Sequence, residues 1–291
     1  MSKIVFKEQE DVVLAAYDSS VDTDIDCEKK SYEGIGEYPY AKYRMEMVLE
    51  ILENHNCDHI LDLGCATGKV LREWKTRGHQ GIGIDISPKF ILQGQDKMEA
   101  EGFARDCLIV DNIKDLSAYE SQSFDAVLAL GVHLFMTEEN EINNLKEIKR
   151  LLKPNGLIIT SYINELVNLF TLNRYTVDIF DKIISRYEMN EPDKERVLEE
   201  YKLLLNHSEA PPPKPSDSYR RMHNPLTLPK VFEELGYKVI DLFFCKFFAF
   251  PPLMEDKFDF YEDYCKKMEI QHAREWYANF TAHAFCLVAQ N

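Results

Sequence analysis

Small residues alternate along one short stretch of the chain in a way that suits a nucleotide-binding turn. Gly64, Ala66 and Gly68 follow an apolar run at residues 60–63, which has the pattern of a buried strand entering its turn. A helix-like run begins directly after the last glycine. Small side chains let the backbone pass close to a ligand, and the N-terminus of the next helix offers free amide donors and a positive dipole end. This order of strand, turn and helix predicts a site for a nucleotide-like ligand.

The residues that follow the turn argue against two common nucleotide sites. A dinucleotide fingerprint requires a third glycine at the position that Lys69 occupies. A P-loop requires Ser or Thr after its Gly-Lys pair, and Val70 stands there instead. An oxidoreductase that uses NAD is therefore disfavoured.

The stretch resembles motif I of the class I S-adenosylmethionine-dependent methyltransferases, an acidic residue followed by Gly-x-Gly-x-Gly. It matches at Asp62, Gly64 and Gly68, and Ala66 replaces the middle glycine. The resemblance continues in order through residues 79–87, 107–116, 123–131 and 145–162. It implies a methyltransferase whose cofactor is S-adenosyl-L-methionine and whose product is S-adenosyl-L-homocysteine.

The resemblance also implies which residues hold the cofactor. Asp85 ends the second strand, where the family binds the ribose, and its carboxylate can accept hydrogen bonds from both ribose hydroxyls. A strand-end Asp can instead cap the next helix, although Ser87 followed by Pro88 could supply that cap. The stretch after the third strand corresponds to the family's contacts with the adenine ring. The implied cofactor-binding set is Asp62, Gly64, Cys65, Ala66, Gly68, Asp85, Ile86, Asp111, Asn112, Ile113 and Leu130.

The implied reaction is an in-line displacement, in which an O, N, C or S nucleophile attacks the methyl carbon of a sulfonium. Alignment and exclusion of water can supply much of the rate, and a base is needed only if the acceptor starts protonated. His133, just beyond the fourth strand, is the candidate catalytic base, and its competing role is to cap or orient the next helix. Tyr162 and His223 are secondary candidates. Arg44 could neutralise the carboxylate of the cofactor or form a surface salt bridge.

The elements that would position these residues form an α/β fold. We predict a doubly wound, Rossmann-like sheet of seven strands with an antiparallel last strand, together with a helical lid built from insertions. The predicted parts are an N-terminal helical arm or lid at 1–57, the S-adenosylmethionine-binding core at 58–162, a helical insertion at 163–222 that serves as a substrate lid, and a C-terminal completion of the sheet at 223–291 with an inserted lid segment at 249–281.

Three of these segments extend beyond the minimal fold, and all can reach the carboxyl ends of the parallel strands, where open α/β sheets bind ligands. We expect them to roof an apolar pocket for a small molecule. The alternative is that each segment packs a small core of its own, and the tyrosine-rich arm allows either interpretation. The aromatic residues considered for the pocket are Phe170, Tyr175, Phe180, Tyr187, Phe250, Phe258, Trp276, Tyr277 and Phe280, and the tyrosines of the arm are Tyr17, Tyr32, Tyr38, Tyr40 and Tyr43.

Composition limits the partners and the compartment. The net charge of −16 repels phosphate backbones, and we find no compensating basic cluster, so we expect no nucleic-acid partner. The seven cysteines are scattered without a Cys-x-x-Cys pair, which suits reduced, buried thiols and no metal site. We see no signal peptide and no membrane-spanning run, so a cytoplasmic location without membrane association is the expectation. Exposed aromatic residues leave a homodimer possible.

The favoured hypothesis is O- or N-methylation of a small-molecule methyl acceptor. One alternative is a non-catalytic protein that keeps the fold and binds the cofactor for regulation. A less favoured alternative is a protein or RNA methyltransferase, which would require an open basic or extended groove. The sequence leaves the acceptor, the methylated atom and the oligomeric state open.

Overall fold

The computed structural model describes residues 28, 32, 39–171, 174–185, 191–205, 220–249 and 261–291. Several residues considered above lie outside this part of the chain: Tyr17, Tyr38, Tyr187, Phe250 and Phe258.

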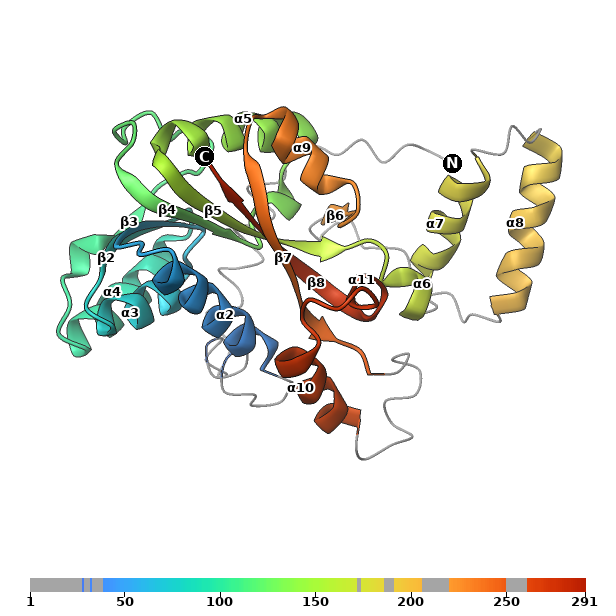
Figure 1. The fold of residues 1–291 in the computed structure, drawn as a ribbon, viewed down its shortest axis with the longest axis horizontal. Helices are drawn as coiled ribbons and strands as arrows, with labels where there is room; N and C mark the ends of the chain where they lie inside the picture. Colours follow the sequence, from blue (N-terminus) through green and yellow to red (C-terminus); the bar gives the residue numbers. More distant parts are fainter. Residues whose placement is uncertain are drawn as a thin grey trace.

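One mixed sheet organises the described residues (Figure 1). Its strands lie in the order β3-β2-β1-β4-β5-β8-β7, and the very short β6 pairs with the end of β5. β8 is antiparallel to both of its neighbours, whereas β1 to β5 are parallel. The strands are β1 (His59–Leu63), β2 (Gln80–Asp85), β3 (Leu108–Val110), β4 (Phe124–Leu130), β5 (Leu152–Asn164), β6 (Met222–His223), β7 (Lys238–Phe247) and β8 (Ala282–Gln290). The predicted fold class is confirmed, and β6 is an addition that the sequence did not indicate.

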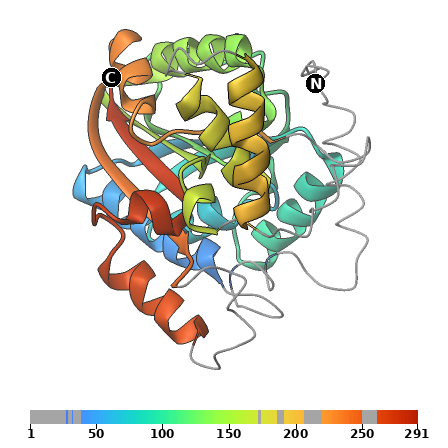
Figure 2. The ribbon, with the colours of Figure 1, turned by 90° about the vertical axis from the view of Figure 1, so that its right-hand side faces the viewer.

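Helices cover both faces of the sheet, as Figures 1 and 2 show. One face carries α2 (Tyr40–Asn54), α3 (Lys69–Thr76) and α4 (Pro88–Ala100), and the other carries α5 (Glu138–Leu151) and α9 (Leu228–Glu234). The remaining helices are the short 3-10 turns η2 (Arg105–Cys107) and η3 (His133–Phe135), and α6 (Asn168–Thr171), α7 (Arg174–Ile184), α8 (Glu191–Leu205), α10 (Tyr261–Gln271) and α11 (Ala278–Thr281).

The alternation of side chains along the strands explains the two layers. Ile60 and Leu128 pack with the α2–α4 layer, whereas Leu61 and Val127 pack with the α5 and α9 layer. All four side chains are fully buried. Successive residues of a strand point to opposite faces, so a strand that is apolar at every position must have cover on both sides.

Local signals fix the helix starts that matter for the site. Ser87 Oγ accepts a hydrogen bond from Phe90 N at 3.3 Å, and Pro88 occupies the first turn of α4. Thr137 caps α5 in the same way, with acidic residues in its first turn, which is why α5 begins earlier than the predicted helix within 145–162. Ser87 therefore provides the cap of α4, and the carboxylate of Asp85 is not required for it.

Candidate active site

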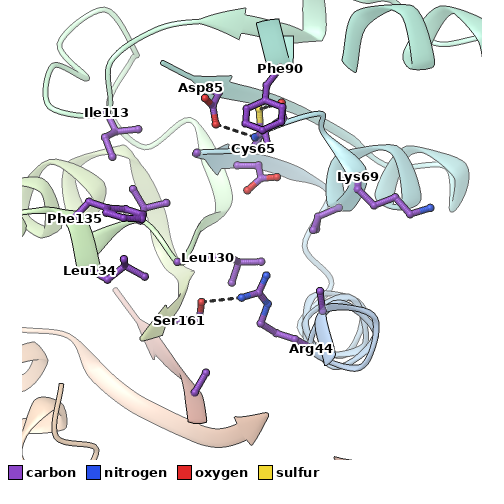
Figure 3. Close-up of a pocket in the computed structure, with 18 of the residues that line it drawn as sticks. Arg44, Cys65, Lys69, Asp85, Phe90, Ile113, Leu130, Leu134, Phe135 and Ser161 are labelled. Carbon is purple, nitrogen blue, oxygen red and sulfur yellow. Dashed lines mark hydrogen bonds between the residues drawn. The ribbon is translucent and has the colours of Figure 1, made fainter. Parts of the chain in front are cut away.

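A cavity of about 520 Å³ opens at the carboxyl ends of the central strands (Figure 3). Its wall includes the turn after β1, the residues after β2 and β3, and the end of β4. On the opposite side it is bounded by α2, η3, β5, β7 and β8. Of the predicted cofactor-binding set, Asp62, Gly64, Cys65, Ala66, Asp85, Ile86, Asn112, Ile113 and Leu130 line this one cavity.

The turn after β1 has a left-handed backbone at three alternate residues. The φ angles are +68° at Gly64, +48° at Ala66 and +71° at Gly68. A Cβ atom at Gly64 would lie only 2.7 Å from Val132 Cγ2, so a larger residue there collides as well as straining the backbone. Ala66 tolerates its unusual conformation because its N–H donates to Asp85 Oδ2 at 2.9 Å.

Asp85 joins the turn to the end of the second strand. Its Oδ2 accepts from Ala66 N, and its Oδ1 accepts from Ser87 N at 2.9 Å. These bonds fix the carboxylate beside the cavity, as the stick view shows.

Two opposite charges lie on the floor of the cavity. Asp62, at 3% exposure, has its pKa raised to about 7, mainly by burial and also by the nearby charge of Asp85, while Arg44 opposes the shift. Arg44 extends from α2 and its Nη1 donates to Ser161 Oγ at 3.3 Å (Figure 3). Its Nε is buried without a hydrogen-bond partner, and no carboxylate of the described residues forms a salt bridge with it. The alternative of a surface salt bridge for Arg44 is therefore not what the structure has.

Two predicted cofactor residues do not line the cavity. Gly68 lies at the end of the turn and is not part of the cavity wall. A Cβ atom at Gly68 would lie 2.9 Å from Leu108 Cδ2. Asp111 bonds within its own loop, since its Oδ1 accepts from Asn112 N at 2.8 Å and its Oδ2 accepts from Tyr119 Oη at 2.7 Å. Asn112 and Ile113, which follow Asp111, do reach the cavity.

His133 is fully buried and is not part of the cavity wall, although Val132 and Leu134 on either side of it are. Asn144 Nδ2 donates to Ile113 O at 2.6 Å, so Asn144 Oδ1 accepts from His133 Nε2 at 2.9 Å. His133 Nδ1 then accepts, with Tyr162 Oη at 3.3 Å.

Burial lowers the pKa of His133, so the imidazole is neutral at neutral pH. This geometry disfavours the predicted base and matches its competing role, because the ring orients groups from η3, α5 and β5 against one another.

The secondary candidates differ from each other. His223 lies away from the cavity wall and its Nε2 is 3.0 Å from Glu141 Oε2. Burial would raise the pKa of Glu141, but the hydrogen bond with His223 and the charge of Arg221 lower it to about 2. Tyr162 does line the cavity, between His133 and His223. Burial raises the pKa of Tyr162 far above its usual range, so its hydroxyl stays protonated.

The far wall of the cavity contains residues that the sequence did not point to. Phe135, Arg220, Lys246 and His283 all line it, together with Tyr40 from the predicted arm. Lys246 and His283 lie near the paired ends of the last two strands, and this position could have indicated them from the sequence. By contrast, the described aromatic residues of the insertions, Phe170, Tyr175, Phe180, Trp276, Tyr277 and Phe280, do not line the cavity.

The described cysteines have the buried environment that the sequence predicted. Cys65, Cys107, Cys245 and Cys286 are buried, unpaired thiols. Within the described ranges, no three His, Cys, Asp or Glu side chains are grouped so that they could hold a metal ion. The helices of the described residues include none that is long and apolar enough to cross a membrane.

Comparison with known proteins identifies the core. Residues 60–156 match the family model described as a methyltransferase domain. This part of the chain, about a third of its length, resembles the class I S-adenosylmethionine-dependent methyltransferases. The match covers β1 to the first part of β5, the stretch that forms the turn and the strand ends described above. The cofactor of this family is S-adenosylmethionine.

Relatives of this chain act on different substrates. It is 31% identical over 111 residues to the sterol 4-C-methyltransferase strm-1 of Caenorhabditis elegans, which is 38% of this chain and 32% of that protein. It is 28% identical over 119 residues to the 18S rRNA (guanine-N(7))-methyltransferase bud23 of Schizosaccharomyces pombe, which is 41% of each. The matched region thus spans less than half of the length of these relatives.

Solved structures agree in fold. A chain from the complex between the Haloferax volcanii Trm112 methyltransferase activator and the putative methyltransferase superposes with a TM-score of 0.56 at 15% identity, covering 96% of both chains. Magnesium protoporphyrin IX methyltransferase from Synechocystis PCC 6803, with bound SAH, superposes with a TM-score of 0.54 at 12% identity, covering 95% of this chain and 94% of that one.

We expect His133→Leu to destabilise the protein because it leaves the buried Asn144 Oδ1 without its donor and removes one of the hydrogen bonds of the Tyr162 hydroxyl, which also bonds with Thr160 and Glu141. The loss in the free energy of unfolding is about 1–3 kcal/mol, from one buried group left unsatisfied. Urea unfolding followed by circular dichroism measures it. His55→Leu, at an exposed position of the same residue type, serves as the control and should change the free energy by less than about 0.5 kcal/mol. Equal stability of His133→Leu and the wild type would contradict the orienting role.

Proposed function

We propose that this protein is an S-adenosylmethionine-dependent methyltransferase that methylates an O or N atom of a small molecule. The observation that carries the proposal is the single cavity that joins the glycine turn to a chamber between α2, η3, β5, β7 and β8. A methyl donor held at the turn and an acceptor held in the chamber would share one cavity. Such a space suits a small molecule better than a folded macromolecule.

The residues at the turn fit the cofactor. The backbone of Gly64, Cys65 and Ala66 borders the cavity, where the absence of bulky side chains allows close approach. Asp85 borders the cavity and would accept from the ribose hydroxyls, and Asn112 and Ile113, which also border it, would contact the adenine ring. Bound S-adenosylmethionine supplies a methyl group on an electrophilic sulfonium.

The charged pair on the cavity floor fits the amino-acid part of the same molecule. Arg44 has a buried, unpartnered Nε that can donate to a carboxylate, and its Nη1 donates to Ser161 Oγ. Asp62 is buried at the end of β1 and would accept from an ammonium group. We therefore assign Asp62, which is already in the set inferred from the motifs, and Arg44, which is not, to the zwitterion.

The chain's own contribution to the reaction would be binding, orientation and exclusion of water. Tyr162 borders the chamber with its hydroxyl held by His133, so its ring is fixed in position. We assign no general base to His133, because both of its ring nitrogens are engaged inside the protein. An acceptor that is already deprotonated, or whose nucleophile is a neutral amine, needs no strong base.

Two other functions compete with this proposal. The bud23 relative makes an RNA methyltransferase a second candidate, but the net charge of −16 opposes binding of a polyanion. A non-catalytic cofactor-binding protein would keep the same turn and acids. Transfer of a labelled methyl group from the cofactor to metabolite extracts or to total RNA separates the three possibilities, because each predicts label in a different fraction or in none. The division into arm, core and lid segments, the cytoplasmic location and a possible homodimer stay predictions.

We expect Asp85→Asn to weaken binding of S-adenosylhomocysteine by about tenfold to a hundredfold, because one charge-assisted bond contributes about 1.5–3 kcal/mol. Isothermal titration calorimetry measures the affinity. Asp106→Asn is the matched control: it makes the same charge change at an exposed residue that is not part of the cavity wall. Equal affinities of Asp85→Asn and the control would refute the ribose assignment, and no binding to the wild type would refute the function.

We also expect cofactor binding to depend on pH through Asp62. Because the pKa of Asp62 in the free protein is about 7, an adjacent ammonium group would favour the carboxylate and bind with release of a proton. Affinity should therefore rise between pH about 6 and about 8 and level off above that pKa. Calorimetry in buffers of different ionisation enthalpy detects the released proton. The rise should vanish in Asp62→Asn; a rise of the same size in that variant would contradict the assignment.

A further inference from the structure

The carboxylates that line the cavity lie at one of its two ends, where Lys69 and Lys114 line it as well. The carboxylates of the wall are Glu28, Asp62 and Asp85, and Asp62 and Asp85 belong to the strand ends at the glycine turn. Glu28 is already paired with Arg72 and hydrogen-bonded to Thr67, beside the same turn. Among the described residues, the wall formed by β5, η3, β7 and β8 has no carboxylate at all. This is unexpected in a chain with a net charge of −16.

The basic side chains of that far wall come from distant parts of the chain. Cys245 pairs with Ala284, and Phe247 pairs with Ala282, so Lys246 and His283 lie opposite each other across β7 and β8. Arg220 stands just before β6, which pairs with the end of β5. The pairing of β7 with β8 therefore brings Lys246 and His283 together at the cavity wall.

Neither Arg220 nor Lys246 is neutralised by an acid in the described part of the chain. Lys246 Nζ lies 4.6 Å from the centre of the Tyr40 ring, and Arg220 Cζ lies 5.8 Å from the centre of the Phe135 ring. Neither takes part in a salt bridge within the described residues, whereas the neighbouring Arg221 binds Glu141 Oε2 at 2.7 Å. Aromatic faces orient a cation without neutralising it, so both cations remain available to an anion.

The backbone at Lys246 adopts a left-handed conformation with φ of +58°. A residue with a long side chain is uncommon there and is disfavoured relative to glycine or asparagine. Strain of this kind persists at sites where the side chain has a task, provided that the surrounding structure holds it. Hydrogen bonds around this position include the one from Phe248 N to Thr281 O at 2.8 Å.

The pKa of His283 is affected by the two positive charges of this region. Burial lowers the pKa of its imidazole to about 4, and the charges of Lys246 and Arg220 act in the same direction. The ring is therefore neutral at neutral pH, and the net charge of the far wall comes from the lysine and the arginine. A neutral imidazole can still donate one hydrogen bond to an anionic oxygen.

We propose that the methyl acceptor is an amphipathic anion whose carboxylate or phosphate binds Lys246 and Arg220, while its apolar or aromatic body packs against Phe135 and Ile163. This inference rests on the proposed function, because it names the substrate class of the same cavity. It assigns a binding role to residues that the family motifs do not cover. It also explains how an acidic protein attracts an anionic substrate, since the charge that matters lines the chamber and not the outer surface.

The test uses a matched panel of small ligands on the full chain saturated with S-adenosylhomocysteine. The panel contains naphthoate and naphthyl phosphate as anions, naphthamide as the neutral isostere and naphthylmethylamine as the cation. Calorimetry at millimolar ligand should give the anions at least about tenfold higher affinity than the amide, as charge-assisted bonds predict. Comparison of naphthoate with naphthyl phosphate shows which anionic group the site prefers.

Single substitutions test which residues bind the anion. Lys246→Asn removes the charge with a residue that tolerates a left-handed backbone, and Arg220→Gln removes the second charge. Each should reduce anion affinity by about tenfold, and Lys246→Arg should retain it. Lys238→Asn is the matched control, because it makes the same charge change at an exposed residue of the same strand. All variants should bind S-adenosylhomocysteine as the wild type does.

The outcomes separate this inference from the proposed function. Preference for the amide or the amine, the absence of any anion binding, or equal anion affinity in Lys246→Asn and Lys238→Asn would overturn the anion site while leaving cofactor binding intact. Failure of the wild type to bind S-adenosylhomocysteine would instead overturn the proposed function. Tighter binding of an RNA oligonucleotide than of the small anions would also overturn the inference.

Discussion

The structure depends on the contact between a strained turn and the carboxylate at the end of the neighbouring strand. Ala66 has a left-handed backbone that alanine rarely adopts, and the bond from its N–H to Asp85 holds it there. The same turn is tied to β2 by Gly64 N and Cys65 N, which donate to Ile84 O at 2.8 and 3.0 Å. Without these bonds the backbone would relax, and the cavity would lose the wall that suits an adenosyl group.

Around this fixed point the cavity has an ordered distribution of charge. Acids lie at the turn, where Lys69 and Lys114 also line the cavity, and Arg44 extends into it from α2. Across the chamber the cations are Lys246 on β7 and Arg220 beside β6, and no carboxylate of the described residues lines that side. A cofactor with a positive sulfonium and an anionic acceptor would each meet groups of opposite charge. The electrostatic field of the site would then orient the cofactor and the acceptor toward each other. Such orientation can supply much of the rate when the methyl donor is already reactive.

Much of this arrangement could be predicted from local sequence. The turn, Asp85 and the strands of the core follow patterns of spacing and hydrophobicity that depend on near neighbours, and the structure places most of the predicted cofactor residues on one cavity. The position of His133 could not be predicted in the same way. Its neighbours in sequence face the cavity, but its own ring turns inward because Asn144 on α5 and Tyr162 on β5 provide partners there. Those partners are far apart in sequence, so only the fold brings them together.

The far wall of the cavity could not be predicted from local sequence either. Lys246 and His283 become neighbours through the register of an antiparallel pair, and Arg220 reaches them from a segment that precedes a very short strand. The insertions, which the sequence suggested as the source of pocket aromatics, contribute none of their described aromatic residues to the wall. Instead, Tyr40 and Phe135 contribute the aromatic faces, from elements that have other roles in the core fold.

The most direct measurement of the central claim is a crystal structure of the protein grown with S-adenosylhomocysteine. The account predicts the adenosyl group against the backbone of residues 64–66, the ribose hydroxyls on Asp85 and the carboxylate on Arg44. A ligand bound elsewhere, or a turn that closes against Val132 and leaves no space for the adenosyl group, would contradict it.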